Sequence, residues 1–221
     1  MTLQHHHVAL VGDSIFDNAV YVPGGPDVAE QLRHLLGDSW KVTLLAVDGD
    51  VVADVRIQLE SMPTDATHIV VSVGGNDALQ HLPLLQQPAD SVADALTGLA
   101  SAREAFRTNY RAMLDFVADM KRPFSVCTIY DSVPGLQPEA NTALAIFNEV
   151  ILREAISNGV PIIDLRVICT DAADYSALSP IEPSVEGGAK IVAAISAMLH
   201  KEPTVHGVVS VIHGDGARQP E

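Results

Sequence analysis

Five short apolar segments, rich in β-branched residues, restrict the fold of this chain more than any other feature. They cover residues 8–11, 42–47, 68–73, 124–129 and 161–165. Each segment is almost continuously apolar and does not alternate between apolar and polar residues. Strands with this pattern are covered on both faces, which is typical of a parallel sheet. The chain is therefore predicted to contain five buried parallel strands.

Segments with helical periodicity separate and follow these strands. They cover residues 27–36, 51–59, 91–120, 141–157 and 184–199, and the third of them is expected to break at Gly98. Regular alternation of strands and helices predicts helices on both faces of one sheet, joined by right-handed crossovers. We therefore expect an α/β fold of three αβα layers, doubly wound and flavodoxin-like, around a five-stranded parallel sheet. Functional sites in such folds lie beyond the carboxyl ends of the strands.

The length of the chain fits one domain with a sizeable core, because 48% of its 221 residues are hydrophobic. We expect a solvated leader over residues 1–7, one domain over 8–201 and an extension over 202–221. Within that extension, 205–213 is a candidate edge strand. Cys127 and Cys169 lie in apolar runs, so both are expected to be buried core residues.

The chain is strongly acidic, with a formal net charge of −15. A surface of this sign repels phosphate backbones and anionic lipids, so neither nucleic acid nor a membrane is expected as a partner. There is no apolar run long enough to span a bilayer and no signal-peptide pattern. We therefore expect a cytoplasmic protein, and the sequence carries no signature of a particular oligomeric state.

Polar motifs follow the first three predicted strands. They are Gly-Asp-Ser at 12–14, Asp-Gly-Asp at 48–50 and Gly-Gly-Asn-Asp at 74–77. Each alone is also explained by an ordinary turn or a helix cap. Parallel strand ends meet at one edge of the sheet, so a serine hydroxyl, a glycine N–H and an asparagine amide are expected to lie close together there. Such donors can stabilise a developing oxyanion.

Together these motifs resemble the SGNH hydrolase superfamily, also called GDSL esterases and lipases, and the resemblance runs from about residue 8 to residue 199. It implies a serine hydrolase that acts on a small-molecule carboxylic ester through an acyl-serine intermediate, with no cofactor. It makes Ser14 the nucleophile. It assigns the oxyanion hole to the backbone N–H groups of Ser14 and Gly49 and to the side chain of Asn76.

The fourth motif of this superfamily, Asp-x-x-His before the last helix, is altered in this chain. Ser179 stands in place of the aspartate and Glu182 in place of the histidine, while the Pro-Ser-x-x-Gly that follows is intact. In one hypothesis Glu182 is the catalytic base, with its pKa raised by burial and its side chain oriented by Ser179.

Two other hypotheses remain open for the altered motif. A histidine from elsewhere in the chain is the base; the candidates are His81, His200, His206 and His213. Alternatively, the protein does not catalyse a reaction, and its pocket binds an acylated or glycosylated ligand.

An acidic rim accompanies the motifs, made of Asp13, Asp17, Asp48, Asp50 and Asp77. Carboxylates bind hard cations, but this spacing matches no known cation-binding loop, so we expect hydrogen bonds to the motif loops and no metal. Residues 77–89 are expected to form a loop, and its leucines are expected either to form an acyl-binding wall or to pack on the core; they are Leu79, Leu82, Leu84 and Leu85.

Two other classes of doubly wound protein fit poorly. A flavin site needs a loop rich in serine, threonine and glycine after the first strand, where this chain has Asp17, Asn18 and Ala19. A phosphoacceptor domain needs a lysine after the fifth strand, and none follows here.

Overall fold

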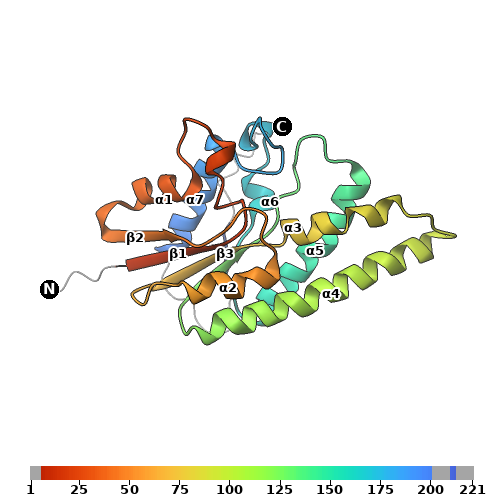
Figure 1. The fold of residues 1–221 in the computed structure, drawn as a ribbon, viewed down its shortest axis with the longest axis horizontal. Coiled ribbons are helices and arrows are strands. Elements are labelled where there is room, and N and C mark those ends of the chain that lie inside the picture. The colour runs from red at the N-terminus through yellow and green to blue at the C-terminus, as the bar shows by residue number, and fades with distance from the viewer. Residues whose placement is uncertain (1–5, 201–209, 213–221) are drawn as a thin grey trace, which may run out of the picture.

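The structure, a computed structural model, describes residues 6–200 and 210–212 and is built around a parallel sheet (Figure 1). The strand order is β2-β1-β3-β4-β5-β6. The strands are β1 (His6–Gly12), β2 (Trp40–Leu44), β3 (His68–Ser72), β4 (Phe124–Cys127), β5 (Ile162–Ile163) and β6 (Val211–Ile212). After β1 the chain forms β2, which pairs with one side of β1, and then β3, which pairs with the other side of β1. The expected doubly wound arrangement is therefore confirmed.

The sheet has six strands, so the expectation of five is one short. The additional strand, β6, pairs in parallel with β5 and lies within the candidate edge strand at 205–213. The first strand also begins earlier than expected, because His6 and His7 belong to β1 and not to a solvated leader. The buried His7 ring lies 2.9 Å from the Asp65 carboxylate and 2.8 Å from the Thr43 hydroxyl, and these contacts hold it in the sheet.

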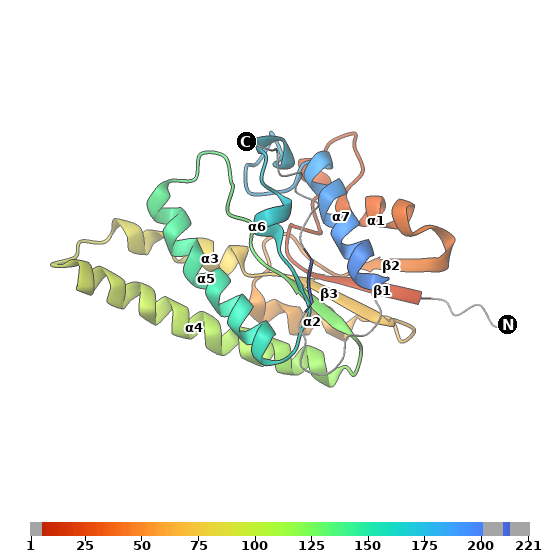
Figure 2. The ribbon, with the colours of Figure 1, turned by 180° about the vertical axis from the view of Figure 1, so that it is seen from behind.

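Helices cover both faces of the sheet, as Figures 1 and 2 show from opposite sides. One face carries α1 (Val28–Leu36) and α7 (Val185–Leu199); the other carries α2 (Val55–Glu60), α4 (Val92–Asp119) and α5 (Pro138–Ser157). Shorter elements are α3 (Gly75–Gln80), α6 (Leu165–Ile168) and the 3-10 turns η1 (Ala19–Tyr21), η2 (Gly37–Ser39), η3 (Val52–Asp54), η4 (Leu82–Gln86) and η5 (Ala172–Asp174). Over the described ranges, no helix has the combined length and apolarity needed to cross a bilayer.

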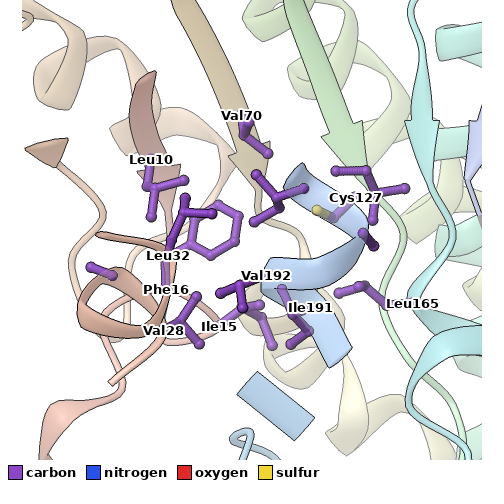
Figure 3. Close-up of a cluster of buried hydrophobic side chains, with 14 of the residues drawn as sticks. Leu10, Ile15, Phe16, Val28, Leu32, Val70, Cys127, Leu165, Ile191 and Val192 are labelled. Atoms are coloured by element: carbon purple, nitrogen blue, oxygen red, sulfur yellow. The ribbon is translucent and has the colours of Figure 1, made fainter. Parts of the chain in front are cut away.

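Successive strand residues point to opposite faces, and both faces are buried. Leu10 and Val70 pack beneath α1 and α7, as Figure 3 shows. Their neighbours Val11 and Val71 join a second core beneath α2, α4 and α5. Two buried faces explain why the strands are continuously apolar. Both cysteines are buried and unpaired, as expected.

The region from residue 77 to residue 120 differs from the expectation in two ways. The segment 77–89 is not a loop, because α3 and η4 occupy most of it. In addition, α4 runs without a break through Gly98. A glycine inside a helix reduces its stability by only about 1 kcal/mol relative to alanine. The other residues of this 28-residue helix offset that loss. A side-chain Cβ at position 98 would lie 4.0 Å from Leu84 Cδ2, so η4 packs closely against the helix at this point.

The helices α4 and α5 run side by side and extend past the sheet (Figures 1 and 2). A buried carboxylate joins them: Glu154 of α5 accepts hydrogen bonds of 2.6 Å from both Arg107 and Arg111 of α4. Charges that are buried in proteins are generally paired in this way. The pairing fixes the separation of two helices that later form the walls of the cleft.

The end of β1 approaches β3 so closely that only glycine fits at position 12. Gly12 has a φ of +131°, and a Cβ on it would lie 1.7 Å from the Ser72 carbonyl oxygen. The Gln58 side chain accepts a hydrogen bond from Gly12 N–H at 2.8 Å. It also donates a hydrogen bond to the Gly12 carbonyl at 2.7 Å. This approach sets where the chain turns after the strand.

We predict that Gly12→Ala destabilises the protein by at least about 3 kcal/mol, because β1 and β3 must separate to admit the methyl group. Gly24→Ala is the matched control: Gly24 also has a positive φ, +80°, but no atom lies within 4 Å of its Cβ position. It should cost only the conformational strain of about 1–2 kcal/mol. Urea unfolding measures both; equal losses would mean that the contact with Ser72 is unimportant.

Candidate active site

Ser14 occupies a tight turn directly after β1. The turn is held by Asp13 N–H, which donates to the Ser72 carbonyl at 3.0 Å, and by Phe16 N–H, which donates to the Asp13 carbonyl at 3.1 Å. The Ser14 side chain lines a cleft at the carboxyl edge of the sheet. Among the described residues, the Ser14 N–H has no acceptor. The serine therefore presents both its hydroxyl and its backbone donor at this edge.

The structure brings Glu182 to the Ser14 hydroxyl. Ser14 Oγ donates a hydrogen bond of 3.3 Å to Glu182 Oε1, and Glu182 is only 4% exposed. The second carboxylate oxygen, Oε2, is buried and accepts no hydrogen bond within the described part of the chain. Burial raises the pKa of Glu182 above its ordinary value of 4.5, and the nearby hydroxyls of Ser179 and Ser14 oppose this rise. A carboxylate in this setting is a stronger base than one in water.

The segment that carries Glu182 is held through its backbone. Tyr130 donates its hydroxyl proton to the carbonyl of Ile181 at 2.5 Å, and the Asn18 side chain donates to the carbonyl of Pro183 at 3.0 Å. Asn18 is fully buried and also accepts from the N–H of Val28, the first residue of α1. The sequence analysis missed both positioning residues, since their partners are 51 and 165 residues away and no local motif indicates them.

The two other predicted oxyanion donors follow neighbouring strands: Gly49 lies after β2, and Asn76 lies in α3 after β3. Asn76 is among the residues that line the cleft, and Gly49 is not. Gly49 has a φ of +88°, and its N–H has no acceptor in the described part of the chain. Its loop is fixed by Asp17, which accepts from the N–H of Asp48 at 2.9 Å. The Asn76 side chain lines the cleft and donates one of its two amide hydrogens to the Asp50 carbonyl at 2.9 Å. The other amide hydrogen is left for a ligand.

The acidic rim is tied to the loops and helices around the serine. Asp13 accepts from Ile15 N–H at 3.1 Å, and Asp77 accepts from Val52 N–H at 3.0 Å. Asp50 accepts from the Gln58 side chain at 2.7 Å. Within residues 6–200 and 210–212, no group of three or more histidine, cysteine, aspartate or glutamate side chains is arranged to hold a metal ion. These carboxylates therefore hold the loops that carry the motifs.

The candidate histidines are placed differently from Glu182. His81 lines the cleft, where its ring packs against Phe147 with 5.7 Å between centroids. His200 follows α7 and lies beside Trp40 at the amino end of β2, away from the serine. His206 and His213 lie outside the described residues. The carboxylate of Glu182 is thus the group that accepts the Ser14 hydrogen bond.

The cleft has a volume of about 100 Å³ and opens to solvent. Ser14, Glu182, Asp13 and Asn76 lie together at one part of it. The remaining walls are mostly apolar and come from α3, η4, α4 and α5. This arrangement, a buried hydroxyl–carboxylate pair beside free N–H donors and an apolar space, suits acyl transfer from an uncharged substrate.

Solved structures that resemble this one share its fold. A lipase, Lip_vut3, from a goat rumen metagenome has a TM-score of 0.68 at 17% identity, over 87% of this chain and 96% of that chain. The acetyl xylan esterase AlAXEase has a TM-score of 0.66 at 16% identity, over 87% and 99% of the two chains. A member of the lipolytic G-D-S-L family from Veillonella parvula DSM 2008 has a TM-score of 0.64 at 17% identity, over 89% and 100%.

Sequence comparison identifies the family directly. No curated protein matches this chain, but the model of the GDSL-like lipase/acylhydrolase family matches residues 10–190. That span begins within β1, before the Ser14 turn, and ends within α7, after Glu182, so it includes every motif described above. The chain is therefore a member of the GDSL-like lipase/acylhydrolase family.

Proposed function

We propose that this protein hydrolyses small-molecule carboxylic esters, with Ser14 as the nucleophile and Glu182 as the general base. The observation that carries the proposal is the hydrogen bond of 3.3 Å from Ser14 Oγ to a buried Glu182 carboxylate. A serine hydroxyl needs an adjacent base to become a nucleophile at moderate pH. The lipases and esterases among the similar structures, and the family itself, support an ester as the substrate.

The reaction follows from the positions of these groups. Ser14 Oγ attacks the ester carbonyl carbon while Glu182 takes the hydroxyl proton. The resulting oxyanion accepts hydrogen bonds from the N–H groups of Ser14 and Gly49 and from the Asn76 amide. Protonated Glu182 then returns the proton to the departing alkoxide, which leaves an acyl-serine. Water attacks this ester in a second cycle, in which Glu182 first accepts a proton and then returns it to Ser14.

A carboxylate differs from the histidine of the superfamily pattern in the charge that it carries before the reaction. Glu182 is negative in its active form and becomes neutral when it takes the serine proton. Its buried, unpaired Oε2 leaves the charged form poorly stabilised, which favours proton uptake. The hydroxyl of Ser179 lowers the pKa of Glu182 and so partly offsets the rise that burial causes. We therefore assign Ser179 a role in setting the basicity of Glu182.

Asp13 lies beside the nucleophile and is also buried. Burial raises its pKa from 3.8 to about 7, and the neighbouring charges of Asp77 and Glu182 add to this, while the Ile15 N–H opposes it. Below about pH 7 the carboxyl group of Asp13 is therefore neutral. In that range it adds no second negative charge next to Ser14, where one would oppose formation of the oxyanion.

We predict that Glu182→Gln lowers kcat/KM for a short acyl ester by at least about 10², because glutamine keeps the shape of the side chain but cannot take the proton. In the parent protein the rate should rise with pH as Glu182 ionises, with a midpoint above 4.5. This rise should be absent from the profile of the variant. Steady-state hydrolysis of p-nitrophenyl butyrate over a range of pH measures both effects.

Two controls accompany that experiment. Glu186→Gln makes the same change at an exposed position four residues further on, in the first turn of α7, and should leave the rate unaltered. Ser14→Ala should abolish hydrolysis while the protein stays folded. If Glu182→Gln retains the parent rate while Ser14→Ala is inactive, the base is another residue and His81 is the next to test. If the folded parent hydrolyses no ester, the protein is a binding protein.

Asn76→Ala tests the oxyanion hole. We predict that it lowers kcat by roughly 10²–10³, as the loss of one oxyanion donor usually does, while KM changes less. The same steady-state assay separates the two constants. Gln80→Ala at the exposed end of α3 is the matched control, since it truncates an amide side chain of the same helix away from the cleft. An unaltered kcat for Asn76→Ala would remove this residue from the site.

Asp13→Asn should increase stability at alkaline pH. A carboxyl group whose pKa is raised in the folded state stabilises the fold while it is protonated, and this contribution is lost as the pH rises from 3.8 through about 7. The difference corresponds to about 4 kcal/mol, at about 1.4 kcal/mol per pKa unit. The variant should therefore exceed the parent in urea unfolding at pH 8 by up to that amount, and by little at pH 4. Asp38→Asn, at an exposed site, should show no such dependence; a pH-independent gain for Asp13→Asn would contradict the assignment.

A further inference from the structure

We propose that the cleft selects an unbranched hydrocarbon acyl chain of medium length, about six to ten carbons, which lies along α5 with its carbonyl at Ser14. This inference rests on the proposed ester hydrolysis for the position of the carbonyl. It adds a substrate class, because apolar side chains of α3, η4, α4 and α5 line the cleft beyond the part next to Ser14.

Apolar side chains of four helical elements line the cleft. Those of α3 and η4 include Leu79, Leu82 and Leu85. Leu79 and Leu82 are 37% and 40% exposed, so they retain apolar surface in contact with water. A hydrocarbon chain in the cleft would cover that surface and gain the free energy of its burial.

The leucines of segment 77–89 divide between the two roles expected for them. Leu79, Leu82 and Leu85 line the cleft, whereas Leu84 packs against α4 at Gly98 and contacts the second core. Leu84 thus fixes η4 on α4, and the other three leucines present their side chains to the cleft. The same short segment therefore supplies both an anchor and an apolar wall.

Further apolar lining comes from the two helices that extend past the sheet. Leu99 of α4 and Ala143 and Phe147 of α5 line the cleft there. The ion pairs of Glu154 with Arg107 and Arg111 hold these two helices together. The wall is consequently part of a fixed helix pair, and its shape is set before a ligand binds.

The distribution of polar groups indicates an uncharged chain. Apart from the His81 ring, which packs on Phe147, the polar side chains lining the cleft lie at the carboxyl ends of the strands or on the segment that carries Glu182. No lysine or arginine lines the cleft among the described residues. A carboxylate or phosphate on the acyl chain would therefore meet no positive charge, and a sugar would leave its hydroxyl groups unpaired.

The length of the wall sets the length of the chain. Cleft-lining residues on α5 extend from 140 to 147, which is about 10 Å at 1.5 Å per residue. An extended chain advances about 1.2 Å per bond, by analogy with the 3.3–3.6 Å that three backbone bonds span. About eight bonds therefore match the wall, which corresponds to an octanoyl group.

Ala143 offers a direct test, because it is small, lines the cleft and belongs to neither core cluster. We expect the parent to hydrolyse p-nitrophenyl octanoate with a kcat/KM at least about 10² above that for the acetate. Ala143→Leu should lower this octanoate-to-acetate ratio at least about tenfold, which is the usual effect of excess methylene groups in an apolar pocket. Ala145→Leu is the matched control on the exposed side of the same helix, and its ratio should equal that of the parent.

The measurements separate failure of this inference from failure of the proposed function. An equal preference for acetate and octanoate in the parent, or an unchanged ratio in Ala143→Leu, would overturn the inference while ester hydrolysis stands. If Ala143→Leu does not fold, Leu82→Ser, on the partly exposed wall, should lower the same ratio. If no ester is hydrolysed, calorimetry on Ser14→Ala decides: binding of methyl octanoate but not methyl acetate supports the apolar cleft, and binding of neither overturns it.

Discussion

The close approach of β1 to β3 is the constraint on which the rest of the site depends. Gly12 lies where a Cβ would overlap the Ser72 carbonyl, and the Gln58 side chain fixes both of its backbone polar groups. The chain must turn immediately after this point, so Ser14 lies at the carboxyl edge of the sheet. The Ser14 hydroxyl is therefore placed by backbone packing, and its position does not depend on the residue at position 182.

Exchange of histidine for glutamate alters the electrostatics of such a site more than its geometry. An imidazole base is neutral before it accepts a proton, whereas a glutamate in the proposed role of Glu182 must be ionised in a buried place. Asp13 is held neutral up to about pH 7 by the same burial. Burial thus raises the pKa of both neighbouring carboxyl groups, and hydrogen bonds from the hydroxyls of Ser14 and Ser179 oppose the rise only at Glu182.

Local patterns in the sequence predicted the features that depend on local chemistry. Continuous apolar runs indicated strands covered on both sides, and the strand-end motifs indicated Ser14, Gly49 and Asn76 at one edge. Features that depend on distant contacts were not predictable. Asn18 acts through a carbonyl 165 residues away. The candidate edge strand at 205–213 was recognised, but its pairing with β5 was not. The leucines of 77–89 fit a packed loop and a wall equally well, and only the three-dimensional contacts separate the two roles.

Three successive carbonyl groups, those of residues 181, 182 and 183, accept hydrogen bonds from Tyr130, from the Ser176 backbone and from Asn18. These bonds hold the main chain on both sides of position 182, and none of them involves the side chain there. A different residue at this position would inherit the same location opposite Ser14. A change of side chain at position 182 would therefore replace the group next to Ser14, and with it the pH range of the proposed chemistry, while the fold around it stays the same.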